Sequence, residues 1–217
     1  MEIRYAGHSS FHIKTKDAKV VTDPFNPTMV GLKYPKTDAD IVSVSHHHGD
    51  HDFVEVVTGS PLIIDWPGEF EKNKVRIFGF KSYHDKNKGA DRGENVLYKF
   101  EVEGISILHC GDLGLVPDDG FIDDIGEVDI LMVPVGGFFT INSDEAVSLI
   151  KKVEPAIVIP MHYNNPKLNQ EQFGKLETVD TFIKKIGATP EPPMPTLVIK
   201  KEDIGEEMKV VVMDIGA

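Results

Sequence analysis

The sequence predicts a mixed α/β fold in a single domain spanning residues 1–217, and two observations carry this prediction. Short apolar segments with the period-two alternation of β-strands fill the first two thirds of the chain, whereas strands and amphipathic helices alternate in the last third. A chain of 217 residues, 41% of them hydrophobic, is long enough to bury one sizeable core. No internal repeat or low-complexity segment indicates a second domain.

The first third is predicted to consist of strands and their connections. Strands are expected over residues 3–5, 11–13, 20–22 and 41–45. Residues 26–38 contain several prolines and glycines and are predicted to form a surface loop, and a short helix is expected over residues 53–57.

The remaining elements follow from the same patterns. Strands are expected over residues 62–64, 75–83, 96–102, 105–108, 129–135, 156–159, 196–199 and 208–213. Glu103-Gly104 is predicted to be a hairpin turn. One helix is expected over residues 146–153 with Asn142 or Ser143 as its N-cap, and a second over residues 173–186 that ends at Gly187. Residues 190–195 are proline-rich and are predicted to form a rigid turn.

Charge and cysteine content exclude several classes of protein. The chain has 23 basic and 35 acidic residues, a net charge of −12, and no cluster of Lys and Arg, so nucleic acid is not an expected partner. The single cysteine, Cys110, excludes an intrachain disulfide and fits a reducing compartment. Residues 1–5 lack the apolar core of a signal peptide, and no segment has membrane-spanning length. A cytoplasmic protein without a membrane partner is therefore predicted.

One short motif concentrates metal-ligand side chains. Directly after the strand at 41–45 comes His46-His47-His48-Gly49-Asp50-His51. His46 and His48 lie two residues apart and point the same way in extended backbone, and Gly49 lets the chain turn so that Asp50 and His51 face a second ion. Imidazole with carboxylate suits zinc, and also iron or manganese. A purification tag would lie at a terminus, and a solvated loop needs no such density of histidine.

Four predicted strands are each followed by residues that can bind a metal. These residues are the His46–His51 motif, His84, Asp112 and His162. A lone histidine after a strand is usually structural, but several such strands predict ligands gathered at one edge of a sheet sandwich.

These residues resemble the motifs of the metallo-β-lactamase superfamily. His46-x-His48-x-Asp50-His51 matches its H-x-H-x-D-H signature. Thr22-Asp23-Pro24, Gly111-Asp112 and Met161-His162-Tyr163 are similar to its other motifs, in the same order along the chain. Within the superfamily the chain looks most like small zinc-dependent hydrolases near the ascorbate-6-phosphate lactonases, through residues 83–85, 92–95, 111–114 and 134–137. The resemblance implies a four-layer αβ/βα sandwich with metals at one edge between the two sheets.

The resemblance also implies a ligand set. One metal would be held by His46, His48 and His84. A second would be held by Asp50, His51 and His162, with Asp112 bridging the two metals. Asp50 would in addition be the catalytic residue that orients a bridging hydroxide or takes its proton.

The sequence signals are less specific for the third histidine ligand of the first metal and for the residues around the ligand set. His84 and His109 both follow strands, but His84 precedes Asp112 by 28 residues and His109 by only three, and the spacing in the superfamily favours His84. Asp23 and His109 are expected outside the metal ligands, with Asp23 fixing the histidine loop. His8 is a candidate for lining the pocket, with a plain turn histidine as the alternative. Arg92 and Asn95 are candidates for binding a substrate anion, with a solvated loop as the alternative.

The implied function is metal-dependent hydrolysis by a dinuclear centre, most simply of zinc with manganese or iron as alternatives. A bridging hydroxide would cleave an ester, phosphodiester or lactone bond of a small molecule. A true β-lactamase is not expected, because several carry cysteine where this chain has Asp112, and diiron redox relatives usually carry glutamate where it has His48. A nuclease of the same superfamily and a non-catalytic metal-binding scaffold are the alternatives; the negative charge opposes the first and the complete ligand set the second. The sequence does not identify the substrate, the metal or the oligomeric state, for which a homo-oligomer is one of the alternatives.

Overall fold

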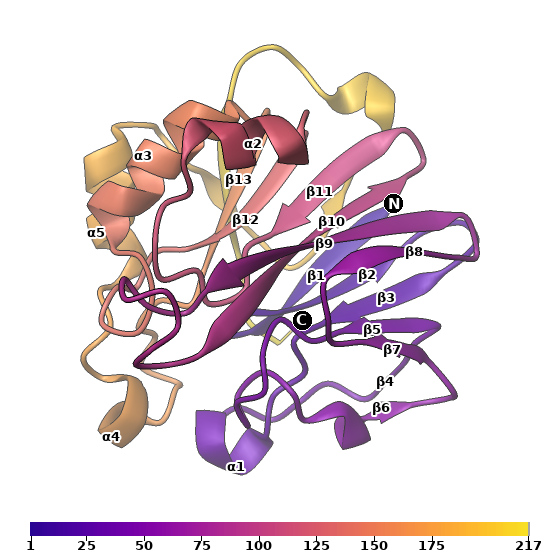
Figure 1. The fold of residues 1–217 in the computed structure, drawn as a ribbon, viewed down its shortest axis with the longest axis horizontal. Helices are drawn as coiled ribbons and strands as arrows, with labels where there is room; N and C mark the ends of the chain where they lie inside the picture. Colours follow the sequence, from indigo (N-terminus) through magenta and orange to yellow (C-terminus); the bar gives the residue numbers. More distant parts are fainter. Residues whose placement is uncertain (217) are drawn as a thin grey trace.

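Two mixed β-sheets stacked face to face form the centre of the molecule, and a computed structural model describes residues 1–216 (Figure 1). The six-stranded sheet has the order β15 (Leu197–Val198), β1 (Glu2–Gly7), β2 (Ser10–Lys14), β3 (Lys19–Thr22), β5 (Ile41–Ser43) and β7 (Leu62–Ile64). The eight-stranded sheet has the order β14 (Glu191–Met194), β16 (Lys209–Met213), β13 (Ile157–Met161), β12 (Ile130–Pro134), β11 (Ile105–His109), β10 (Glu94–Val102), β9 (Val75–Tyr83) and β8 (Gly68–Lys72). The predicted fold class is confirmed.

The main core lies between the two sheets. Tyr5 and Phe11 stack on each other from the six-stranded sheet, with 4.8 Å between their ring centroids. Tyr98 faces them from β10, and its hydroxyl reaches the Val44 carbonyl on the opposite sheet. The other face of β10 is buried as well, because Lys99 extends under the helical layer and donates to the Ile125 carbonyl. The alternation along residues 96–102 therefore separates two packed faces rather than a buried and a solvated one.

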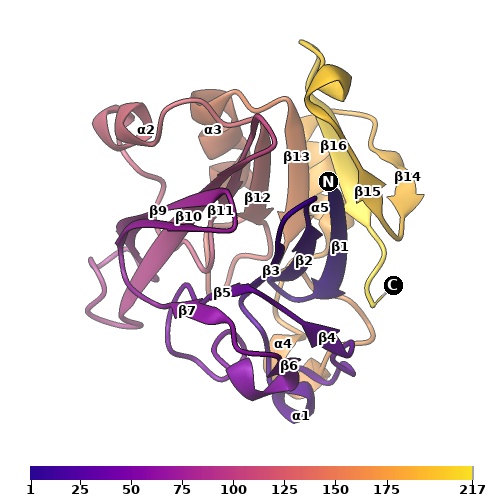
Figure 2. The same cartoon turned by 90° about the vertical axis from the view of Figure 1, so that its right-hand side faces the viewer.

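The outer layers differ in thickness. Three helices, α2 (Asp119–Ile125), α3 (Ser143–Val153) and α5 (Val179–Ile186), cover the eight-stranded sheet (Figure 1). The six-stranded sheet is covered by short pieces: the 3₁₀ helix η1 (Val54–Val56) and the two-stranded sheet of β4 (Thr37–Asp38) and β6 (Val57–Thr58), which lie near α1 (Pro27–Val30) in Figure 2. Val42 and Val44 pack against these pieces. The fourth layer is thus made mostly of extended chain.

Three segments differ from the sequence prediction. Residues 26–38 contain the helix α1, capped by the Asn26 side chain, and the predicted turn at 190–195 contains the edge strand β14. Of the helix predicted over residues 173–186, only residues 179–186 are observed as one helix, α5; Phe173 ends the separate short helix α4 (Gln170–Phe173), and residues 174–178 are not helical. The chain leaves helical conformation between them because the Glu177 N–H donates to the Gly136 carbonyl and its carboxylate accepts from Ser143. The short strands β4, β6 and β8, the helix α2 and the 3₁₀ helix η2 (Lys201–Asp203) carry no strong sequence signal.

Across residues 1–216, every helix is too short or too polar to cross a lipid bilayer.

Candidate metal centre

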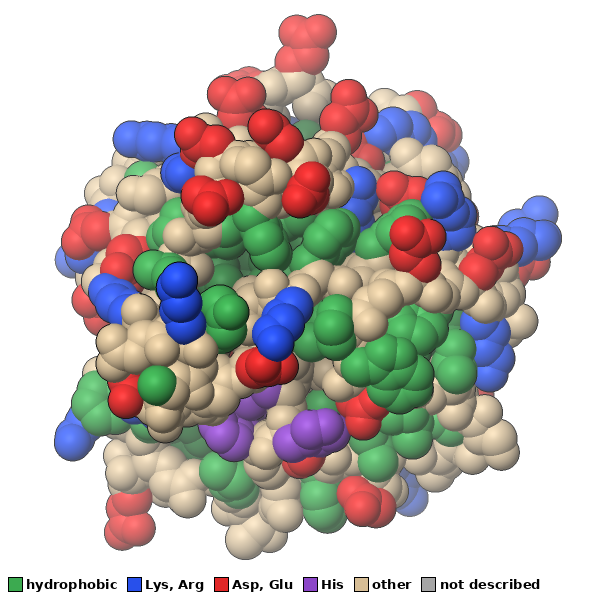
Figure 3. Space-filling model, viewed as in Figure 1, with side chains coloured by type: hydrophobic (Ala, Val, Ile, Leu, Met, Phe, Trp, Pro, Cys, Tyr) green, Lys and Arg blue, Asp and Glu red, His purple; other side chains and the backbone are tan. Residues whose placement is uncertain are grey.

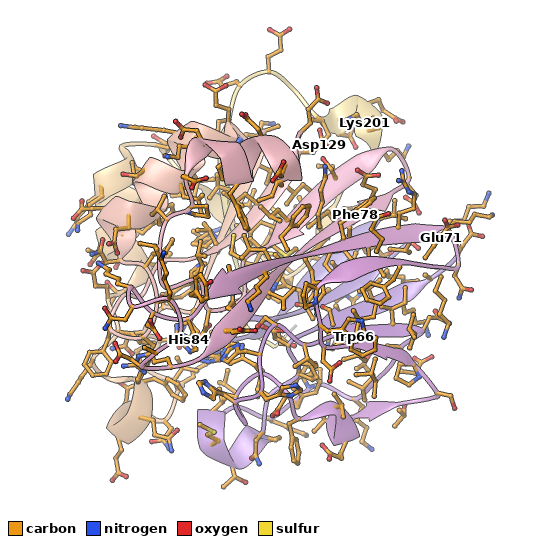
Figure 4. All side chains as sticks on the ribbon, in the orientation of Figure 1. Trp66, Glu71, Phe78, His84, Asp129 and Lys201 are labelled. Carbon is orange, nitrogen blue, oxygen red and sulfur yellow. The ribbon has the colours of Figure 1, made fainter. Side chains whose placement is uncertain are left out.

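The direction of the strands brings the predicted site residues to one edge. In the six-stranded sheet β1 and β3 are both antiparallel to β2, and β5 is parallel to β3. The strands β1, β3 and β5 therefore run in the same direction. In the other sheet β9, β11 and β13 also share one direction. Their carboxyl ends are followed by His8, Asp23, the His46–His51 motif, His84, Asp112 and His162. Figure 4 shows His84 where β9 ends, at the lower edge of the sandwich.

The ligand-type side chains form two groups that meet at one carboxylate. His46, His48 and His84 make one group, and His8, Asp50, His51 and His162 make the other; within each group one donor atom per residue lies within 4.8 Å of the rest. Asp112 lies between them, with Oδ2 3.3 Å from His84 Nε2 and 3.2 Å from His162 Nε2, and with Oδ1 3.3 Å from His51 Nε2. A carboxylate in this position is within reach of a cation held by either group.

Buried atoms without hydrogen-bond partners show that the site fits a metal. Among residues 1–216, His46 Nε2, His51 Nε2, His162 Nε2 and Asp112 Oδ1 are buried and make no hydrogen bond. Leaving such atoms unpaired costs about 1–3 kcal/mol each, so their clustering points to a bound group that satisfies them. Imidazoles with carboxylates suit zinc, iron and manganese.

Burial and neighbouring charges set the protonation of this cluster. Burial, followed by the charge of His51, holds the pKa of His46 well below its ordinary value, and burial also lowers the pKa of His84. Burial alone would raise the pKa of Asp112, but the charges of His162 and His51 outweigh it and keep that pKa well below its usual range. Neutral His46 and His84 beside an ionised Asp112 offer lone pairs to a cation without first losing a proton.

Asp23 accepts hydrogen bonds at both ends of the histidine motif. Its carboxylate accepts hydrogen bonds from the Ser45 N–H at 2.8 Å, the Ser45 hydroxyl at 2.6 Å and His51 Nδ1 at 2.9 Å. Because His51 Nδ1 donates to Asp23, its Nε2 faces the cluster. Burial would lower the pKa of His51, but the charges of Asp112 and Asp50 outweigh it and raise that pKa, so a cation that binds Nε2 displaces a proton.

The remaining candidates lie outside the two groups or contact them indirectly. Asn95 is fully buried; its Oδ1 accepts from the Asp112 N–H at 2.9 Å and its amide donates to the Cys110 carbonyl at 3.0 Å. It therefore positions the backbone of residues 110–112 and does not line the cavity. His109 is also buried and lies in neither group, because its Nε2 donates to the Ser9 carbonyl at 2.7 Å. The His47 side chain is 66% exposed and belongs to neither group, although it lines the cavity next to them.

His8 is the residue for which the sequence gives the least guidance. It is 1% exposed, and its Nε2 lies 3.0 Å from Asp50 Oδ2. Because a carboxylate can only accept, the imidazole donates here and holds Asp50 in place. Burial, followed by the neighbouring His162, lowers the pKa of His8 to about 4, so the ring is neutral at pH 7. The one sequence signal that places His8 beside the site is its position directly after β1, whose carboxyl end lies at the same edge as the other ligand-type residues.

The cluster opens into a cavity of about 440 Å³. Figure 3 shows histidine side chains reaching the surface at one place on this face. The cavity floor is formed by His48, His84, Asp50 and Asp112, and its walls by Met29, Phe139, Phe173, Gln172 and Arg92. This is a pocket of small-molecule size in which apolar walls surround a few polar groups.

Substituting Asp23 by asparagine should weaken metal binding about 10–100-fold, because the amide cannot accept all three hydrogen bonds and the His51 ring loses its orientation. Asp129→Asn is the matched control: Asp129 likewise accepts from the N–H and hydroxyl of one serine, Ser106, but lies outside the metal groups. Metal affinity, measured by competition with a chromogenic chelator, should fall in the first variant only. Equal affinities in both variants would contradict the role given to Asp23.

Comparison with known proteins gives a consistent result. Residues 2–162, which run from β1 to His162, match the model of the beta-lactamase superfamily domain. A UPF0173 metal-dependent hydrolase of Thermococcus onnurineus is 28% identical over 86% of this chain and 97% of its own length. A second UPF0173 metal-dependent hydrolase, from Bacillus cereus, is 28% identical over 86% of this chain and 96% of its own.

Solved structures agree with the sequence matches. A metallo-β-lactamase superfamily protein of Thermotoga maritima, provisionally assigned as a zinc-dependent hydrolase, is 34% identical; the match covers 99% of this chain and 98% of that one, with a TM-score of 0.81. A metallo hydrolase of Ignicoccus hospitalis is 21% identical over 100% of this chain and 96% of that one, with a TM-score of 0.70, and at that identity it supports the fold alone.

Proposed function

This chain belongs to the metallo-β-lactamase superfamily and to the UPF0173 metal-dependent hydrolases within it, and on that basis we propose that it is a dinuclear zinc hydrolase of small molecules. The observation that carries the proposal is the position of Asp112 between two sets of donor atoms, whose residues are all buried except His48. One zinc would be held by His46, His48 and His84, and the other by Asp50, His51 and His162, with Asp112 shared.

The bound metals would supply a nucleophilic oxygen at neutral pH and Lewis-acid stabilisation of the leaving oxygen. The protein supplies the rest. Asp50 lies at the cavity floor, where its carboxylate can take a proton from a reacting group, and the hydrogen bond from His8 Nε2 keeps it there. Met29, Phe139 and Phe173 line the cavity around this floor and limit its contact with bulk water.

We further propose that the bond cleaved is an ester, lactone or phosphodiester. All three pass through a transition state in which negative charge develops on oxygen, and imidazole-bound cations stabilise such charge. Residues 83–85, 92–95, 111–114 and 134–137 resemble those of small zinc-dependent hydrolases near the ascorbate-6-phosphate lactonases, and this resemblance supports including lactones. The 440 Å³ cavity supports a small substrate rather than a nucleic-acid strand.

Metal removal tests the proposal. Protein purified without chelator and without a histidine tag should contain about two zinc ions per chain by elemental analysis. Stripping them should abolish hydrolysis of chromogenic esters, lactones and phosphodiesters. It should also lower the melting temperature by roughly 5–10 °C, because a ligand at 100 times its Kd contributes about 2.7 kcal/mol. Zinc should restore both properties.

Each outcome separates one part of the proposal from the others. About one ion per chain would contradict the dinuclear centre. Two ions per chain with no turnover of any of the three bond classes would contradict the hydrolase and favour a metal-binding scaffold.

A further inference from the structure

Arg92 is a cation without an acidic partner at the mouth of the cavity. Of the three arginines in the chain, Arg4 and Arg76 form ion pairs with Glu2 and Glu101, at 3.9 and 2.9 Å. Arg92 is half-buried, lines the cavity, and has no carboxylate within 4.0 Å among residues 1–216. In a chain of net charge −12, a partly desolvated and unpaired guanidinium is costly to retain unless it binds something else.

The loop that carries Arg92 is held rigidly. Asp85 is 8% exposed. Its carboxylate accepts four backbone hydrogen bonds, from Asn87 at 2.7 Å, Gly89 at 3.0 Å, Asp91 at 3.0 Å and Arg92 at 2.7 Å. The loop is closed by the His84 N–H, which donates to the Gly93 carbonyl at 3.1 Å. The backbone at Arg92 is therefore tied to that of His84, a proposed zinc ligand.

An aromatic ring fixes where the guanidinium sits. The Arg92 Cζ lies 4.8 Å from the centroid of Phe139, and that ring also lies 6.4 Å from the ring of His162, centroid to centroid. A guanidinium stacked on a ring keeps its N–H groups free at its edge, where they can bind both oxygens of one anion. The positive charge is thus placed about one aromatic ring away from the metal ligands.

We propose that Arg92 is an anion-binding subsite, and that the substrate carries a carboxylate or phosphate one ring's width from the bond that is cleaved. The inference rests on the proposed hydrolase function and deepens it by naming the substrate class: a small ester or lactone with an anionic group at its far end. The rigid loop and the stacking on Phe139 place the cation before substrate arrives, so little ordering accompanies binding.

Hydrolysis of matched substrates tests this assignment. The probes are p-nitrophenyl butyrate, which is neutral, mono-p-nitrophenyl glutarate, which ends in a carboxylate, and its analogue ending in a phosphate. The wild type should prefer one of the anionic esters in kcat/KM, and the better anion identifies the group that the subsite takes. Arg92→Ala should lower the ratio of anionic to neutral kcat/KM by about ten- to a hundredfold, the range expected for a lost charge-assisted hydrogen bond. Arg92→Lys should recover only part, because it keeps the charge and loses the planar pair of donors.

Lys175 offers a matched control. Its ammonium lies 5.0 Å from the ring of Phe138, the neighbour of Phe139, but it does not line the cavity. Lys175→Ala makes the same change in net charge and should leave the ratio unaltered. Equal losses in the two variants would show a general charge effect and overturn the subsite.

Binding separates this inference from the proposed function. Calorimetric titration of the zinc-loaded protein with glutarate and with glycerol 3-phosphate needs no turnover. Weaker binding in Arg92→Ala alone, without hydrolysis of any probe, would keep the subsite and overturn the hydrolase. Hydrolysis whose anion preference and anion binding are both unchanged in Arg92→Ala would keep the hydrolase and overturn the subsite.

Discussion

Replacing His84 by glutamine should remove about one of two zinc ions per chain and lower hydrolysis by about three orders of magnitude, whereas His109→Gln should leave the metal content unchanged. His84 Nε2 lies 3.3 Å from Asp112 Oδ2, in a group with His46 and His48. A factor of 10³ corresponds to about 4 kcal/mol, which is the scale of the Lewis-acid stabilisation lost with one ion of a pair.

His109 is the control that the chain itself provides, because it is the last residue of β11, in the same sheet as β9, and is also buried. Its imidazole donates to the Ser9 carbonyl, a bond that a glutamine amide can also make, so His109→Gln should affect stability more than metal content. Elemental analysis of both variants, with circular dichroism to show that each is folded, decides between the two histidines. Loss of metal from His109→Gln but not from His84→Gln would reverse the assignment.

Much of the site could be predicted because it depends on local sequence and strand direction. Apolar segments ending in His46, His84, Asp112 and His162 are visible without a structure, and parallel carboxyl ends bring them together. The strand β9 spans Val75–Tyr83, the predicted range, and Asn142 caps α3 as one of the two predicted alternatives. These elements follow from periodicity and capping, which are short-range signals.

The rest depends on contacts between distant residues. The break between α4 and α5 exists because Glu177 bonds to Gly136 and Ser143, which no helical periodicity records. The stacking of Arg92 on Phe139 likewise joins loops from two different strand ends. Sequence alone left two interpretations of Arg92, a residue that binds a substrate anion or part of a solvated loop. Only the tertiary structure shows that Arg92 has no acidic partner and lines the cavity.

Gly111→Ala should weaken binding at both metal positions and lower the free energy of unfolding by about 2–5 kcal/mol, the sum of backbone strain and overpacking. Gly111 has φ +53°, in the left-handed region that favours glycine. A Cβ at this position would lie 2.5 Å from the Cβ of Ser45 and still closer to Asn95 Oδ1. Both neighbours would have to move, and Asn95 holds the Asp112 N–H while Ser45 hydrogen-bonds the Asp23 that orients His51.

Gly187→Ala isolates the backbone contribution, because Gly187 has φ +69° but no atom lies within 4 Å of the Cβ that would be added. It should cost only about 1 kcal/mol, a shift of roughly 2–4 °C in melting temperature, and should keep both metals. If Gly111→Ala matched Gly187→Ala in melting temperature and in zinc content, the close approach of three strand ends would not be what positions Asp112. If only Gly111→Ala lost zinc, the result would show that the Asp112 carboxylate reaches both groups of histidines only when residue 111 has no side chain.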